Sequence, residues 1–368
     1  MTLSMNRRRF MQAASSVAAV GALSSVAGRA LAQSSGELTV AVGGGAWGKA
    51  NIEAYLKPFE AETGIKVNPI TDEMGRQQLE LMVKTNNVTV DVFSMGQTTS
   101  YLVHARGLLE EIDYSIYKKE ELDGIPDFAK QPFGLAALIY SHNLAYNTEK
   151  FATSGPRPNT WADFWNIEKF PGARTLVTGA WGGGGPYEEA LLADGVAPEK
   201  LYPLDIDRAF ASLDKIKPHV RKWWTTGSEV QQMMHDRAVD MAQTYDGRAI
   251  LLKDQGSPIE IVRNQAKLVW DFWVIAKGSP NATNAQKFVE FTSRADRQAV
   301  FAQLIPYGPC NLNAFHLMPE EVGRKLASHP DYMESSIPEN GKWYAEVGAD
   351  GVTNAERIIQ RWNEWILL

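Results

Sequence analysis

The chain alternates between short apolar strands and amphipathic helices, and this alternation is the strongest constraint on its fold. An apolar run at 37–42 is followed by Ile52, Tyr55, Leu56 and Phe59, which recur at the spacing of one helix face. A second strand, another amphipathic helix and a third strand come next, at 65–67, 76–84 and 88–93. This order builds a parallel sheet with helices packed on its faces, so the sequence predicts an α/β fold.

The same alternation continues along the rest of the chain. We expect further strands at 136–147, 174–178, 239–244, 259–261 and 271–276. We expect further helices at 160–165, with Thr160 as the N-terminal cap, and at 187–192, 206–216, 284–293, 296–304 and 355–365.

The first 32 residues have the features of an export signal. Arg7, Arg8 and Arg9 resemble a twin-arginine motif, a weakly apolar stretch follows, and Ala30-Leu31-Ala32 supplies a small-x-small cleavage pattern. We therefore expect residues 1–32 to be a twin-arginine-type signal peptide, cleaved near Ala32 after the twin-arginine export machinery delivers the chain to the periplasm. The three arginines would also serve the general export route. A membrane anchor is the weaker alternative, because residues 13–28 carry four serines and two glycines.

The charge and the cysteine content exclude several classes of protein. Residues 1–32 contain four arginines and no acidic residue. Cleavage of this segment therefore changes the formal net charge of the chain from −6 to −10. A protein this acidic has no general attraction for nucleic acid or anionic lipid and is better suited to a cationic ligand. With Cys310 as its one cysteine, the chain forms no intramolecular disulfide.

Six segments together resemble the extracellular solute-binding proteins of the spermidine/putrescine type, the receptors of ABC importers. They lie in the family's order at 58–67, 107–113, 145–151, 160–165, 245–249 and 305–309. The resemblance implies a two-lobed periplasmic binding protein fold with a two-strand hinge and a ligand in the interlobe cleft. It implies lobe 1 at 36–137 and 272–314, lobe 2 at 138–271 and 315–368, and ABC importer permease subunits in the inner membrane as partners. The implied ligand is a small amine such as putrescine or spermidine.

An organic ammonium is held by aromatic faces and a carboxylate. In α/β sheets, ligands bind outside the carboxyl ends of the strands. The candidate ligand-binding residues in such loops are Trp47, Gln97, Trp181, Trp224, Tyr245, Asp246, Arg248, Asp271, Trp273 and Tyr307. The resemblance implies that Asp271 holds a ligand amine and that Tyr245 stands where polyamine binders have a stacking tryptophan. The alternative for Asp271 is a surface carboxylate beside a strand.

The chain departs from the polyamine pattern at one loop. Polyamine binders carry an acidic pair where this chain has 181–186, and the nearest carboxylates here are Glu188 and Glu189. Arg248 has the fork geometry that binds a carboxylate, although it also fits a solvated helix start. These features favour a zwitterionic ω-amino acid such as γ-aminobutyrate as the alternative ligand, ahead of thiamine or iron.

Catalytic and cofactor motifs do not support an enzyme. The glycines at 43–48 fit G-x-G-x-x-G, but no acidic residue follows near Val67 to hold a dinucleotide ribose. The six histidines form no metal-spaced pair, and Cys310 has no histidine nearby in the sequence. The sequence therefore predicts a binding protein with no cofactor and no bound metal.

Overall fold

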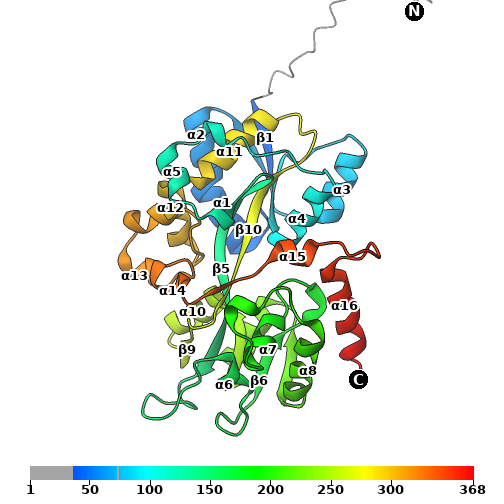
Figure 1. The fold of residues 1–368 in the computed structure, drawn as a ribbon. Helices are drawn as coiled ribbons and strands as arrows, with labels where there is room; N and C mark the ends of the chain where they lie inside the picture. Colours follow the sequence, from blue (N-terminus) through cyan, green and yellow to red (C-terminus); the bar gives the residue numbers. More distant parts are fainter. Residues whose placement is uncertain (1–35, 73) are drawn as a thin grey trace, which may run out of the picture. The chain divides into compact units, whose positions relative to one another are not determined.

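The computed structural model describes residues 36–72 and 74–368 (Figure 1). These described residues form one compact unit. The predicted signal peptide, residues 1–32, lies outside the described residues. No helix in the described ranges is long and apolar enough to cross a membrane.

Eleven strands of the described chain join in one mixed sheet, and its main path runs β2-β1-β3-β10-β5-β8-β6-β7. The strands are β1 (Glu37–Ala41), β2 (Lys66–Ile70), β3 (Val92–Gly96), β4 (Lys130–Gln131), β5 (Gly134–Asn147), β6 (Arg174–Val177), β7 (Val220–Trp224), β8 (Met241–Tyr245), β9 (Ile259–Ile261), β10 (Lys267–Ile275) and β11 (Ile337–Pro338). β1 pairs in parallel with β2 and β3, whereas β10 runs antiparallel to β3 and β5. The predicted α/β class is confirmed.

The helices include all those that the sequence pattern predicts, together with several that it does not. They are α1 (Gly45–Asn51), α2 (Lys57–Thr63), α3 (Arg76–Lys84), α4 (Gln97–Ala105), α5 (Lys119–Asp123), α6 (Trp161–Trp165), α7 (Tyr187–Ala193), α8 (Ile206–Ile216), α9 (Gly227–His235), α10 (Asp246–Asp254), α11 (Ala282–Ser293), α12 (Ala295–Leu304), α13 (Glu320–Gly323), α14 (Pro330–Met333), α15 (Gly341–Ala345) and α16 (Asn354–Trp365). A π-helical turn, η1 (Ile52–Leu56), joins α1 to α2. The 3-10 turns include η4 (Gly179–Trp181) and η7 (Leu312–Leu317). The predicted cap at Thr160 is confirmed, because its side chain accepts a hydrogen bond from Asp163 N.

Several strand boundaries differ from the prediction, β7 was not predicted, and two of the differences affect the surroundings of Asp271. β3 begins at Val92 rather than at 88 and continues to Gly96, which pairs with Asp271. β10 begins at Lys267 rather than at 271, because residues 267–270 pair with β5. Both shifts extend the ladders around Asp271, so this residue lies within the sheet rather than at a strand start.

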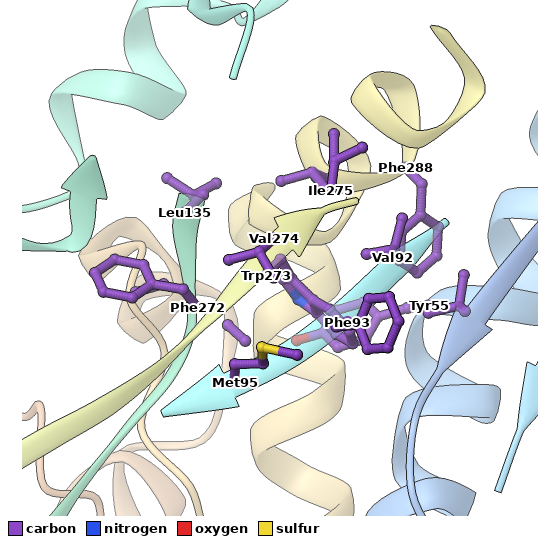
Figure 2. Close-up of a cluster of buried hydrophobic side chains, with 14 of the residues drawn as sticks. Tyr55, Val92, Phe93, Met95, Leu135, Phe272, Trp273, Val274, Ile275 and Phe288 are labelled. Atoms are coloured by element: carbon purple, nitrogen blue, oxygen red, sulfur yellow. The ribbon is translucent and has the colours of Figure 1, made fainter. Parts of the chain in front are cut away.

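Buried hydrophobic side chains gather in two large clusters. The first core combines β1, β3 and β10 with Tyr55, Phe59 and Phe288. Figure 2 shows part of it, with side chains of β3, β5 and β10 packed together with Tyr55 and Phe288. The second core combines α6, α7, α8 and α16. β5 contributes Leu135 to the first core and Leu144 to the second, so this strand connects the two. The exact lobe boundaries stay a prediction.

A second connection between the two cores is made near the C-terminus. β11 pairs in parallel with the start of β10, and α15 packs against α4, whose Val103 belongs to the first core. α16 then packs against η4 and contributes Trp362 to the second core. The segment 337–365 therefore contacts elements of both cores (Figure 1).

Candidate ligand-binding site

A cavity of about 280 Å³ lies where β5, β10 and the N-terminus of α10 meet. We call it the aromatic cavity. Its lining consists of Trp47, Leu138, Tyr140, Gly227, Tyr245, Arg248, Asp271 and Tyr307. Its volume is close to the lower end of the range of about 300–1,000 Å³ that is usual for ligand pockets. The cavity therefore suits a small molecule, and it offers one guanidinium, one carboxyl group and four aromatic rings.

The sheet positions Tyr140 and Asp271 on neighbouring strands. Leu138 and Tyr140 are two residues apart on β5, so their side chains point to the same face and both reach the cavity. Asp271 pairs with Leu138 across the ladder, and a register shift follows directly after it. The Tyr140 hydroxyl approaches Asp271 Oδ1 at 3.5 Å, at the outer limit of a hydrogen bond.

The aromatic rings pack edge to face around the cavity. The ring centres of Trp47 and Tyr307 are 5.8 Å apart, those of Tyr140 and Tyr307 are 6.1 Å apart, and those of Tyr140 and Tyr245 are 5.7 Å apart. Rings held in this way keep part of their π faces available, and an ammonium over such a face gains about 0.5–2 kcal/mol.

Asp271 is a carboxyl group without a cation of its own. No lysine or arginine of the described residues forms an ion pair with it, and burial raises its pKa to about 6, against the smaller opposing effect of the Tyr140 hydroxyl. A carboxylate removed from water in this way is stabilised by any ammonium that enters the cavity. Burial also raises the pKa of Tyr307 to about 12, so this phenol stays neutral.

Arg248 supplies the opposite charge from the first turn of α10. Its Nη1 donates to Gln231 Oε1 at 3.0 Å, which anchors the side chain to α9, and it lies beside Gly227. No carboxylate in the described ranges pairs with it. A guanidinium carries five N–H donors, so Arg248 keeps donors for a ligand carboxylate.

A second cavity, of about 230 Å³, shares Tyr140 and Tyr245 with the first. We call it the polar cavity. Its lining consists of Gly96, Gln97, Thr98, Thr99, Tyr140, His142, Trp181, Gly183, Gly184, Tyr245, Val269, Trp270 and Glu339. Besides Tyr245, two further predicted residues, Gln97 and Trp181, line this second cavity. Glu188 and Glu189 do not line this cavity. Both are buried and already form ion pairs with Lys267 Nζ, at 3.0 and 3.1 Å.

Three predicted site residues do not reach either cavity, which corrects the expectation for them. Trp224 is fully buried behind Tyr245, with ring centres 5.3 Å apart, and its Nε1 donates to Gln243 O. Asp246 is fully buried, accepts a hydrogen bond from Ser141 N and lies 3.5 Å from Arg263. Trp273 packs in the first core (Figure 2), with its ring centre 5.8 Å from that of Phe288.

Sequence reasoning missed several residues that line the cavities, among them the polar side chains of Tyr140, His142 and Glu339. Tyr140 and His142 follow Leu138 at intervals of two residues on the strand predicted at 136–147. Residues at this spacing share one face of a strand, and this period could have indicated that they lie together. Glu339 reaches the polar cavity through the pairing of β11 with β10, which no local pattern indicates.

The described residues offer no arrangement for a metal. No group of three or more His, Cys, Asp or Glu side chains in these ranges is placed to hold an ion. Cys310 is buried, its Sγ donates to Ala136 O, and burial raises its pKa to about 12. A thiol in this state is not a nucleophile.

Comparison with known proteins gives the family. The family model described as bacterial extracellular solute-binding protein matches residues 54–327. A protein of Pseudomonas aeruginosa named gamma-aminobutyric acid-binding protein is 33% identical over 337 residues, which are 89% of this chain and 90% of the relative. The solved structure of a γ-aminobutyric acid (GABA) receptor is similar with a TM-score of 0.80 and 30% identity, covering 89% of this chain and 97% of the receptor.

An ABC transporter substrate-binding protein from Bradyrhizobium japonicum is equally similar. Its TM-score is 0.81 and its identity 31%, and the match covers 90% of this chain and 99% of that protein. The expected family of extracellular binding proteins is thus confirmed, whereas the finer assignment to the spermidine/putrescine type is not. The chain belongs to the bacterial extracellular solute-binding protein family and is the substrate-binding receptor of an ABC transporter, not an enzyme.

Proposed function

We propose that this receptor binds a zwitterionic ω-amino acid of the GABA type in the aromatic cavity. The ligand carboxylate lies against the Arg248 guanidinium, and its ammonium lies between Asp271 and the aromatic rings. The observation that carries the proposal is that these two opposite charges line one cavity and neither has an ion-pair partner within the described chain. The names of the relative from Pseudomonas aeruginosa and of the solved GABA receptor support the same ligand class.

The charges of the cavity argue against a polyamine as the ligand there. A diamine needs a carboxylate for each ammonium, and the aromatic cavity offers Asp271 alone. Its second ammonium would lie near Arg248, and a like-charge contact of this kind costs several kcal/mol. A zwitterion satisfies both side chains at once.

The receptor's location and motion complete the proposal. Residues 1–32 serve as the signal peptide, cleaved near Ala32, and the twin-arginine machinery exports the chain to the periplasm. The two lobes, divided near 137/138 and 271/272, close on the ligand about a hinge formed by β5 and β10, because contacts from both sides favour the closed form. The closed receptor then delivers the ligand to ABC permease subunits in the inner membrane.

A calorimetric titration with matched ligands tests the proposed ligand class. We expect GABA to bind and putrescine, in which an ammonium replaces the carboxylate, to bind at least about 100-fold more weakly, which corresponds to about 3 kcal/mol. Butyrate and butylamine, each with one of the two charges, serve as controls and should both bind weakly. Tighter binding of putrescine than of GABA would contradict the proposal.

A further inference from the structure

Two polar groups at the polar cavity lack a hydrogen-bond partner. The Thr98 and His142 side chains both line this cavity, and within the described ranges Thr98 Oγ1 and His142 Nδ1 are buried without a partner. His142 as a whole is 2% exposed. A buried polar atom that forms no hydrogen bond costs the full free energy of its desolvation, so proteins pair such atoms with protein, water or ligand groups. The polar cavity is therefore suited to an occupant that forms hydrogen bonds.

The two groups lie beside neighbouring glycines of one loop. A Cβ at Gly183 would lie 2.5 Å from Thr98 Oγ1, and a Cβ at Gly184 would lie 3.9 Å from His142 Cε1. Gly184 also has a φ of +78°, which favours glycine. Because this stretch of the loop has no side chains, its backbone approaches Thr98 closely and places no polar side chain against either group.

The N-terminus of α4 adds hydrogen-bond donors to the wall of the polar cavity. Thr98 and Thr99 belong to the first turn of this nine-residue helix, and both line the cavity. The first backbone N–H groups of a helix have no carbonyl partner within it, and the N-cap residue, Gly96, has no side chain to accept from them. These N–H groups and the positive end of the helix dipole would stabilise an oxygen atom of an occupant.

The charges around the polar cavity favour a neutral occupant. Its described lining contains Glu339 and no lysine or arginine, so an anion would be repelled. Both Glu339 oxygens already accept hydrogen bonds, from Gly184 N at 2.5 Å and from Gln97 Nε2 at 3.3 Å, so this carboxyl does not need a cation as a partner. Burial holds the pKa of His142 well below its ordinary range, so the ring is neutral and has one N–H donor and one acceptor nitrogen. Hydroxyl and amide groups match these partners.

The polar cavity adjoins the aromatic cavity next to the proposed ammonium site. Tyr140 and Tyr245 line both cavities. Asp271 pairs across the sheet with Gly96, which lines the polar cavity, and a Cβ at Gly96 would lie 3.8 Å from Asp271 Oδ1. Because Gly96 has no side chain, none at this strand position separates the carboxyl from the polar cavity. The ligand nitrogen beside Asp271 is therefore the atom from which a substituent enters the polar cavity.

We propose that the polar cavity is a second subsite, which binds a neutral, hydroxyl- or amide-bearing substituent on the ligand nitrogen. The ligands of this class are N-alkylated ω-amino acids. Their secondary ammonium keeps its charge for Asp271, and their carboxylate lies against Arg248. The substituent forms hydrogen bonds with the Thr98 hydroxyl and the His142 ring. The subsite rests on the proposed function, because Asp271 has to bind the ammonium, and it extends the ligand class to molecules larger than GABA.

A calorimetric titration of the mature protein with matched derivatives of GABA tests the subsite. N-Hydroxypropyl-GABA, with its hydroxyl at the end of the chain, should bind at least as tightly as GABA and about tenfold more tightly than N-butyl-GABA, in which a methyl group replaces the hydroxyl. N-Aminopropyl-GABA and N-carboxyethyl-GABA, with a charged group at the same place, should both bind more weakly than the hydroxyl derivative. Equal binding of the hydroxypropyl and butyl derivatives, or tightest binding of a charged one, would overturn the proposal.

Two variants locate the substituent. Thr98→Val and His142→Phe keep the size of the side chain and remove its hydrogen-bonding atoms, so each should reduce the preference for the hydroxypropyl over the butyl derivative by about threefold to tenfold. Thr153→Val, at an exposed threonine, is the matched control and should keep the wild-type preference. An unchanged preference in both variants contradicts the proposed placement. The derivatives alone decide the matter in the wild type if a variant fails to fold.

The same titrations separate a failure of the subsite from a failure of the proposed function. If GABA binds and N-hydroxypropyl-GABA binds more than about tenfold more weakly, the subsite is wrong and the proposed function stands. If N-hydroxypropyl-GABA binds with the expected dependence on Thr98 and GABA gives no heat, GABA is not the ligand and the subsite stands. If neither compound binds, both proposals are wrong.

Discussion

Replacement of Arg248 by glutamine is expected to weaken GABA binding by about 30-fold to several thousandfold. Loss of one partner from a buried charge pair costs about 2–5 kcal/mol, and every 1.4 kcal/mol is about a factor of ten in affinity. Glutamine is shorter and neutral, so the variant loses the charge and the two-pronged contact with the carboxylate. Titration calorimetry of the purified variant measures the effect.

Two controls separate a role in binding from a role in folding. Arg324→Gln, at a half-exposed arginine paired with Glu320, should bind GABA as the wild type does. The ligand-free melting temperature of Arg248→Gln should fall only slightly, because among the described residues its side chain forms one hydrogen bond, with Gln231. Unchanged GABA affinity in Arg248→Gln would remove this residue from the site.

Replacement of Asp271 by asparagine is expected to weaken GABA binding by a similar factor and, at the same time, to stabilise the ligand-free protein above about pH 6. Burial raises the pKa of Asp271, so its ionised form lowers the stability of the folded protein at neutral pH. Asparagine keeps the shape and removes the charge. The gain in melting temperature should be largest at about pH 8 and shrink as the pH falls towards about 4, where the wild-type carboxyl is itself protonated.

Weaker GABA binding together with higher ligand-free stability distinguishes a ligand-binding carboxylate from a structural one. A structural ion pair would give the opposite result, because its removal lowers stability at neutral pH. Asp127→Asn, at a fully exposed position, should change neither property. A lower ligand-free melting temperature with intact GABA binding in Asp271→Asn would rule out the proposed role.

The fold was largely predictable because regular periods reveal regular elements. The helix at 76–84 and the helix at 206–216 occur at the predicted bounds, since each has an apolar stripe along one face. α4, α9 and α10 were missed. α4 begins with polar residues directly after β3, and the apolar residues of α10 form one run at 249–252 rather than a stripe, so these two helices have no clear helical period. α9 does place Val230, Met233 and Met234 at helical spacing, but this stripe is short and was overlooked.

The part of the candidate site that could be predicted consists of residues whose side-chain chemistry suits a charged ligand. We selected a carboxylate, an arginine and aromatic rings near predicted strand ends by their chemistry, and Trp47, Tyr245, Arg248 and Tyr307 do meet Asp271 in one cavity, although Asp271 lies within β10 rather than in a loop. Trp273 was misplaced because β10 is covered on both faces, so alternation along it does not separate the site from the core. The position of Glu339 could not be predicted, because it depends on the pairing of β11 with β10, and sequence periodicity does not indicate which strands pair.

A crystal structure of the mature protein grown with GABA tests the central claim most directly. We predict electron density for the ligand in the aromatic cavity, with its carboxylate on the Arg248 guanidinium and its ammonium beside Asp271. Density in a different place, or a ligand in the reverse orientation with its ammonium near Arg248, would contradict the account.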